Sequence, residues 1–169
     1  IYVIDRKTIT PISYGGKQEG LLNPGTENVP SICAFGLACE KVLYNYKETE
    51  VKVKELNHFL RDKLKKLPVE IVFNSKEDEG YSPYVLNFLI KGIKGGDLVK
   101  YLSLKEVYVS TGSACTLGKR SHVLEARGLS NEVLEGSIRI GFSKETTFSD
   151  LEILCSSIKE YLDNKSGAK

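Results

Sequence analysis

Apolar residues recur along this chain in two periods, one of two residues and one of about 3.6 residues. The first period predicts strands, which we expect at residues 1–4, 69–73, 84–90, 107–110 and 137–142. The second predicts a long helix from Ile32 to Leu67, ended by Pro68, and shorter helices at residues 97–104 and 123–127. A final helix follows from residue 149. Strands with helices between and after them predict an α+β fold.

Capping residues indicate where the shorter helices begin. Asp97 and Ser121 stand at the starts of two of them, and Ser149 to Glu152 have the spacing of a capping box at the start of the last one. Three cysteines, Cys33, Cys39 and Cys155, lie on or near the apolar faces of the predicted helices. We therefore expect these three thiols in the core.

Residues 8–30 contain too many glycines and prolines for a helix. Within them, Gly16–Gly20 and Asn23–Asn28 present backbone amides together with the hydroxyl of Thr26. Such a loop can hold an anion such as phosphate, and it can equally be an ordinary cluster of turns.

Composition narrows the classes of function. The 169 residues are 41% hydrophobic and 27% charged, which is typical of a globular protein in water. With 24 basic and 22 acidic residues the net charge is only +2, which argues against a nucleic-acid or membrane partner held by bulk charge. No apolar run is long enough to span a membrane, and the chain opens with no signal-peptide pattern.

Cysteine and histidine usage points to a reduced, cytoplasmic protein. The four cysteines are widely spaced with no C-x-x-C pair, so a disulfide framework is not expected. Only His58 and His122 are present, so a zinc site would need an unusual set of ligands. We expect His58 to be a solvated helix residue, and His122 either a structural residue or a proton carrier. The chain contains no methionine, even at its start, from which we expect a truncated or processed piece.

Cys115 differs from the other cysteines in its surroundings. It follows the small residues Ser110 to Ala114 and precedes a polar segment with Lys119 and Arg120. We expect a thiol on such a loop beside two cations to be accessible and to have a lowered pKa, so we interpret Cys115 as reactive rather than structural.

Arg139 stands inside the apolar strand at 137–142, with Ile138 and Ile140 on the opposite face. A guanidinium in this position is costly without an anionic partner. That partner is either a structural carboxylate or the carboxylate of a substrate.

Five segments resemble, in order, those of the cysteine desulfurases, pyridoxal-phosphate enzymes of the class-V aminotransferase group. They are Gly15–Gly20 with Pro24–Pro30, Ser82–Asn87, Ser110–Cys115, Ser121–Leu124 and Gly136–Ile140. The resemblance covers nearly the whole chain and is closest to the type that serves iron–sulfur clusters and tRNA thiolation. It implies the small C-terminal domain of a fold-type-I enzyme, with a mostly antiparallel sheet packed against helices. Its domains would be 1–30, the last strand and loop of the large domain; 31–67, a linking helical region; 68–164, the small domain; and 165–169, a tail.

The resemblance also implies roles for three residues. Cys115 would be the nucleophile that takes sulfur from L-cysteine as a persulfide and leaves L-alanine. Arg139 would bind the substrate carboxylate. Thr26 would contact the phosphate of the pyridoxal phosphate bound by the second subunit of a homodimer, and a further protein would accept the sulfur.

The chain departs from the family at two places. Asn23 stands where the family usually has arginine, and nothing here matches the Ser-x-His-Lys motif that carries the cofactor-binding lysine. We therefore expect these 169 residues to bind no cofactor and to turn over no cysteine by themselves. One alternative is a cofactor-free sulfur carrier or protein-interaction module that uses Cys115. Another is a transaminating relative, which would have no use for a thiol on a mobile loop.

Overall fold

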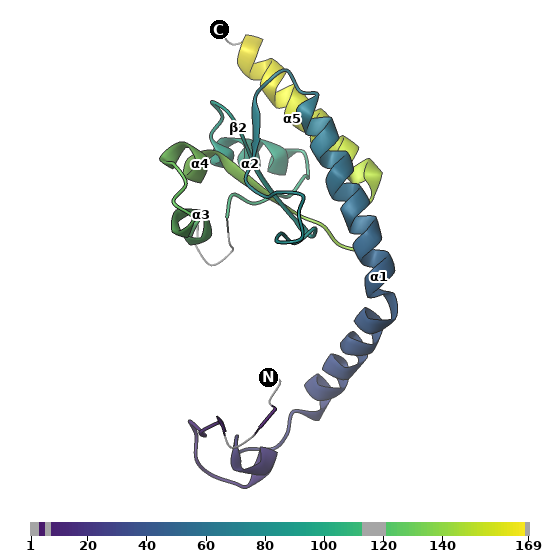
Figure 1. Ribbon diagram of the computed structural model, residues 1–169, viewed down its shortest axis with the longest axis vertical. Helices are drawn as coiled ribbons and strands as arrows, with labels where there is room; N and C mark the ends of the chain where they lie inside the picture. The colour runs from purple at the N-terminus through teal and green to yellow at the C-terminus, as the bar shows by residue number, and fades with distance from the viewer. Residues whose placement is uncertain (1–3, 6–7, 113–120, 168–169) are drawn as a thin grey trace. The chain divides into compact units, whose positions relative to one another are not determined.

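The chain forms two compact units, residues 1–46 and residues 47–169, in a computed structural model (Figure 1). The structure describes residues 4–5, 8–112 and 121–167. The division between the units falls inside the region 31–67 that we expected to link two domains. The expected domain borders themselves stay predictions.

The first unit consists of a loop-rich segment and the first half of a long helix. A short 3-10 helix, η2 (Gln18–Leu21), precedes α1 (Val29–Lys65). The side chain of Asn28 accepts a hydrogen bond from the backbone N–H of Ser31 at 3.2 Å, so it satisfies one free donor at the start of α1. Of the strand expected at residues 1–4, positions 1–3 lie outside the described residues, and Ile4 lies in a bend.

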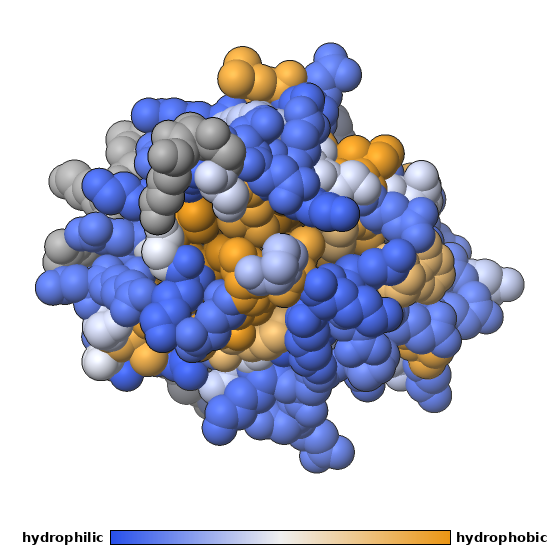
Figure 2. Space-filling model, turned by 90° about the horizontal axis from the view of Figure 1, so that it is seen from above, coloured by the Kyte–Doolittle hydropathy of each residue, from blue (hydrophilic) through white to orange (hydrophobic). Residues whose placement is uncertain are grey.

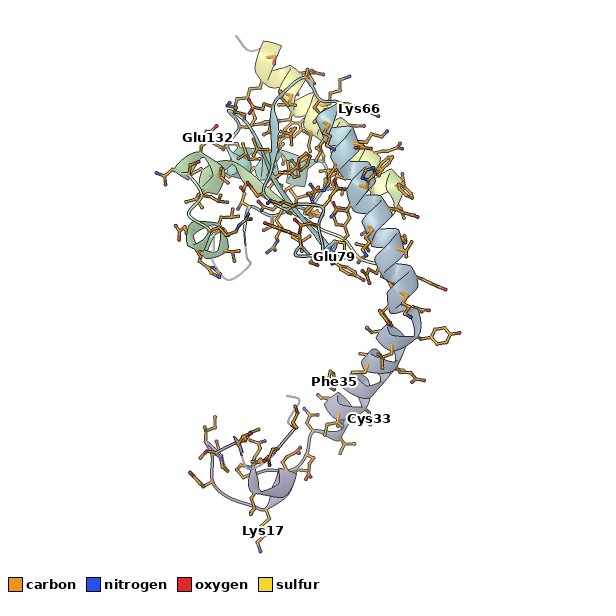
Figure 3. All side chains as sticks on the ribbon, viewed as in Figure 1. Lys17, Cys33, Phe35, Lys66, Glu79 and Glu132 are labelled. Atoms are coloured by element: carbon orange, nitrogen blue, oxygen red, sulfur yellow. The ribbon has the colours of Figure 1, made fainter. Side chains whose placement is uncertain are left out.

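The apolar face of the first half of α1 is exposed. Phe35, Val42 and Leu43 are 70%, 63% and 71% exposed, and Cys33 is exposed as well. Figure 3 shows Cys33 and Phe35 on this half of the helix. Cys39 is half-buried. Our expectation of a core position is therefore wrong for Cys33, because helical spacing identifies a face without establishing what covers it.

The second unit contains a three-stranded antiparallel sheet in the order β1-β2-β3. The strands are β1 (Ile71–Phe73), β2 (Val85–Ile90) and β3 (Ser137–Gly141). Three of the predicted strands are thus confirmed, with β1 shorter than expected. The strand expected at residues 107–110 is wrong, because this segment pairs with the sheet only through an isolated bridge between Ser110 and Arg139.

One face of the sheet carries the main core. Phe88 and Ile138 are cross-strand partners and are almost completely buried on this face, and so are their neighbours Leu86, Ile90 and Ile140. They pack with the second half of α1, with α2 (Gly95–Leu104) and with α5 (Phe148–Gly167). The second half of α1 runs beside α5 (Figure 1), and the rings of Phe59 and Phe148 meet edge to face at 5.0 Å. The predicted α+β class is confirmed.

The other face of the sheet is covered only in part. Here lie α3 (His122–Ala126) and α4 (Asn131–Gly136), which leads directly into β3. Leu124 of α3 and Leu134 of α4 are buried. The side chains of Asn87 and Arg139 occupy the uncovered part of this face and are half-buried.

Two helix starts differ from expectation. The helix assigned to the Asp97 cap begins two residues earlier, at Gly95, and Asp97 lies in its first turn. The last helix begins at Phe148 and is capped by Thr147 with Asp150, not by Ser149 with Glu152. Ser121 does precede α3 as expected, although its side chain makes no capping hydrogen bond.

The surface is mainly hydrophilic in the view from above, with a hydrophobic area between the polar side chains (Figure 2). None of the helices in the described part of the chain has the length and apolar character that a membrane span requires.

Candidate functional site

Arg139 lies on β3 with its side chain on the partly covered face of the sheet. Asn87 of β2 lies opposite it in the ladder, and on the other side Ser110 donates its N–H to the Arg139 carbonyl at 3.2 Å. The Arg139 N–H donates in return to the Ser110 carbonyl. This bridge fixes the start of the segment that carries Cys115 next to Arg139, five residues before the cysteine in the sequence. Cys115 itself lies outside the described residues, so its role stays a prediction.

A turn follows the bridge. The Ser110 hydroxyl donates to the Gly112 carbonyl at 2.6 Å and accepts from the Gly112 N–H at 3.2 Å. These bonds hold residues 110–112 in a compact turn at the edge of the sheet. The next described residue is Ser121, directly before α3.

A cleft of about 350 Å³ opens between this turn, the two strands and α3. Among the described residues its lining contains two guanidinium groups and no carboxylate. The lining residues are Asn74, Ser75, Tyr81, Val85, Asn87, Gly112, Ser121, Val123, Leu124, Arg127 and Arg139. A cleft with this charge favours an anionic ligand.

The two arginines of the cleft differ in their partners. Arg127, directly after α3, donates to the Asn74 carbonyl at 2.8 Å and to the Tyr81 hydroxyl at 3.1 Å. It thereby ties α3 to the loop between β1 and β2. The guanidinium of Arg139 has no hydrogen-bond or ion-pair partner among the described residues. Of the two partners that the sequence leaves open for Arg139, a structural carboxylate is therefore absent from the described part of the chain.

Two buried residues, Asn74 and Ser137, and the half-buried Asn87 form a polar network beside Arg139. The side-chain nitrogen of Asn74 lies 2.7 Å from Oδ1 of Asn87 and 3.0 Å from Oγ of Ser137. Our sequence reasoning missed this network. Its one signal is that Asn87 stands as a single polar residue within the apolar run of β2, two residues from Val85 and Leu89 on the same face.

Thr26 belongs to the first unit and lines a hollow of about 310 Å³ near the start of α1. Its side chain is exposed, and the loop behind it is held by a hydrogen bond from the Gly25 N–H to the Gln18 side chain at 3.2 Å. Glu19 and Glu27 line the same hollow. The exposed Thr26 hydroxyl can donate to a phosphate, but the two carboxylates of the same hollow would repel it.

The remaining cysteines and histidines provide no second site. Burial raises the pKa of the Cys155 thiol to about 11, and this residue packs against the core of the second unit as expected. His58 lies between two carboxylates, with Nε2 at 3.3 Å from Asp62 and Nδ1 at 3.0 Å from Glu77. His122 is exposed at the start of α3. Within the described ranges no group of three or more His, Cys, Asp and Glu residues could hold a metal ion.

Comparison with known proteins agrees with the resemblance seen in the sequence. The chain is 33% identical over 163 residues to a protein of Rickettsia typhi named cysteine desulfurase IscS, and 32% identical over 154 residues to one of the same name from Methanosarcina thermophila. In both cases the match covers 90% of this chain and 38% of the relative, so the chain spans less than half the length of these relatives.

Solved structures give the same result. The X-ray structure of a NifS-like protein from Rickettsia africae superposes with a TM-score of 0.79 at 33% identity, over 92% of this chain and 40% of that one. A second NifS-like protein superposes with a TM-score of 0.77 at 30% identity. The predicted relation to part of a fold-type-I enzyme is thus confirmed. The profile of the aminotransferase class-V family matches residues 4–154, so this chain belongs to that family.

Proposed function

We propose that the chain is part of a cysteine desulfurase, in which Arg139 binds the substrate carboxylate and Cys115 accepts the sulfur. The observation that carries the proposal is the position of Arg139. Its guanidinium, without an anionic partner among the described residues, lines a carboxylate-free cleft next to the start of the Cys115 segment. The relatives named cysteine desulfurase add support, because L-cysteine is an amino acid with the carboxylate that this guanidinium requires.

In this proposal Arg139 binds the substrate and Cys115 takes its sulfur. Arg139 holds the carboxylate of L-cysteine in a bidentate pair and so fixes the orientation of its side chain. The Cys115 thiolate attacks the substrate sulfur; the S–S bond forms as the C–S bond breaks, and the carbon fragment keeps the electron pair and takes up a proton. The products are L-alanine and a persulfide on Cys115. Pyridoxal phosphate, when bound, supplies the electron withdrawal that allows the C–S bond to break, which no side chain can provide.

We assign Thr26 to the cofactor phosphate of the partner subunit in a homodimer. Thr26 is exposed and lines the hollow, and its hydroxyl is a suitable donor for a phosphate oxygen. Because none of the 169 residues matches the lysine motif of the family, we propose that turnover requires a segment that supplies this lysine. A sulfur-acceptor protein then removes the persulfide, within the cytoplasm, for iron–sulfur cluster assembly or tRNA thiolation.

The test compares two cysteine substitutions in the desulfurase that contains this chain, loaded with pyridoxal phosphate and given L-cysteine. Cys115→Ala should abolish both the release of L-alanine and the added sulfur atom seen by mass spectrometry. Cys33→Ala, which removes an exposed thiol from the first unit, should leave both unchanged. Undiminished persulfide in Cys115→Ala would contradict the proposal. Persulfide formed from a sulfur donor without any cofactor would favour a sulfur carrier instead.

A further inference from the structure

The polar network beside Arg139 has a fixed hydrogen-bond direction. Its first member is the backbone carbonyl of Val133, which can only accept, and the Ser137 hydroxyl lies 2.5 Å from it. The single proton of this hydroxyl is therefore used on Val133. The Ser137 oxygen must then accept from the next member, which is the side chain of Asn74 at 3.0 Å.

The orientations of the two amide side chains follow from the direction of this bond. Because Asn74 donates to Ser137, the atom it presents is its Nδ2, whose second proton points to Asn87 at 2.7 Å. The atom of Asn87 that faces Asn74 must be an acceptor, namely Oδ1. The Nδ2 group of Asn87 consequently points away from Asn74, and it has no acceptor among the described residues.

Asn87 stands directly opposite Arg139. The two residues are cross-strand partners in the β2–β3 ladder and share the partly covered face of the sheet. Opposite side chains in an antiparallel pair start about 5 Å apart. Both residues line the same cleft, so two neighbouring donor groups face it with no acceptor from the described residues.

The backbone of Asn87 is also anchored. Its N–H donates to the Ser75 hydroxyl at 2.7 Å, and its carbonyl accepts from the N–H groups of Asn74 and Ser75 at 2.8 and 3.2 Å. The side chain therefore starts from a fixed point and is oriented by Asn74. A donor held in this way loses little entropy when a ligand binds.

We propose that Asn87 is a second binding residue for the carboxylate of the amino-acid substrate, donating from Nδ2 beside the guanidinium of Arg139. A carboxylate only accepts hydrogen bonds and has about four acceptor positions, so it can satisfy both donors together. An amino-acid amide presents an NH₂ group to one of them and is rejected. The inference rests on the proposed function, since it takes the Arg139 ligand to be a substrate carboxylate.

The test follows the side-chain signals of Asn87 and Arg139 by NMR in the full chain labelled with ¹⁵N. L-alanine, the reaction product, is titrated against L-alaninamide, which has the same side chain but no carboxylate. L-alanine should shift the Asn87 NH₂ and Arg139 Nε signals with the same saturation curve, and L-alaninamide should shift neither.

Substitution provides the second arm. Asn87→Asp retains an acceptor for Asn74 but places an oxygen where Nδ2 stood, so the affinity for L-alanine should fall about ten-fold or more. The matched control Asn164→Asp, at an exposed position of α5, should leave the affinity unchanged. In the cofactor-loaded desulfurase the same Asn87→Asp change should raise KM for L-cysteine more than it lowers kcat.

The experiments distinguish the role of Asn87 from the carboxylate-binding role of Arg139. A response of Arg139 without Asn87, or an unchanged affinity in Asn87→Asp, overturns the role of Asn87 and leaves the proposed function intact. The absence of any L-alanine response at both residues overturns the carboxylate role of Arg139 together with this inference.

Discussion

Arg61 is a buried charge whose contacts reach the wall of the Arg139 cleft. Its side chain, on the second half of α1, donates to Oδ1 of Asn57 at 2.8 Å and to the Ser75 carbonyl at 2.9 Å. The guanidinium also lies over the ring of Phe73, with 4.9 Å to the ring centre. Burial lowers the pKa of Arg61, while the carboxylate of Glu77 opposes this change. The Ser75 hydroxyl also accepts from the Asn87 N–H, so Arg61 helps to hold Ser75 and Asn87, two residues that line the cleft.

Replacing Arg61 with methionine should therefore destabilise the second unit strongly. The apolar stem is retained, but Asn57 and Ser75 lose a charged donor in a buried position, which costs about 2–4 kcal/mol. The matched control is Lys66→Met, an exposed cation just after α1 (Figure 3), which should change the free energy of unfolding by less than about 0.5 kcal/mol. Urea unfolding measures both. Equal stability of the two variants would mean that water replaces the lost donor.

At the scale of the element, α5 begins with a reciprocal cap. The Thr147 N–H and hydroxyl both donate to Oδ2 of Asp150 at 2.8 Å, and the Asp150 N–H donates back to the Thr147 hydroxyl at 3.2 Å. The backbone hydrogen bond from Thr147, followed by the one from its hydroxyl, lowers the pKa of Asp150 below its usual value of 3.8. The charged form of this carboxyl therefore stabilises the start of the helix.

This cap predicts a pH-dependent difference between the natural chain and Asp150→Asn. Because the pKa in the folded state is the lower one, the carboxylate contributes its stability fully above pH 3.8 and loses it as the pH falls through the folded value. The natural chain should have the higher urea midpoint near neutral pH, and the difference should shrink below pH 3.8. Asp163→Asn, near the far end of α5, is the control and should show no such gain at neutral pH. A constant difference down to the lowest pH would exclude titration of the Asp150 cap.

The elements show how far the sequence alone could predict this structure. Runs such as Val85–Ile90 gave the three strands, since their apolar residues had to be buried. Val107 to Val109 are also β-branched and aromatic but form no ladder, because pairing depends on a partner strand that the local sequence does not specify. Arg139 was identified from the sequence because a guanidinium within an apolar strand is unfavourable without an anionic partner. Asn87 was not, because its significance depends on Asn74 and Ser137, which only the folded sheet brings together.

At the scale of the whole molecule, the buried core of the described residues belongs to one unit. In this part of the chain, every residue of the main hydrophobic cluster lies between Val53 and Leu162, and the fully buried positions of α1 all belong to its second half. The large apolar side chains of the first half, such as Phe35 and Leu43, are mostly exposed. Because burial of apolar surface is the main source of stability, the second unit should provide most of the free energy of folding.

A shortened chain of residues 47–169 should accordingly unfold like the complete one. Its cut falls at the border of the two units and leaves the cluster from Val53 onward intact, so the urea midpoint should be unchanged and the slope only slightly smaller. A matched cut at residue 57 removes Val53 and Leu56, both completely buried, and should lower the midpoint severely. Hydrogen exchange gives the same comparison within the complete chain: the backbone amides of residues 53–64 should exchange only on global unfolding, and those of residues 33–46 much faster. Equal protection in both halves of α1 would show that the exposed half draws stability from contacts outside the core cluster.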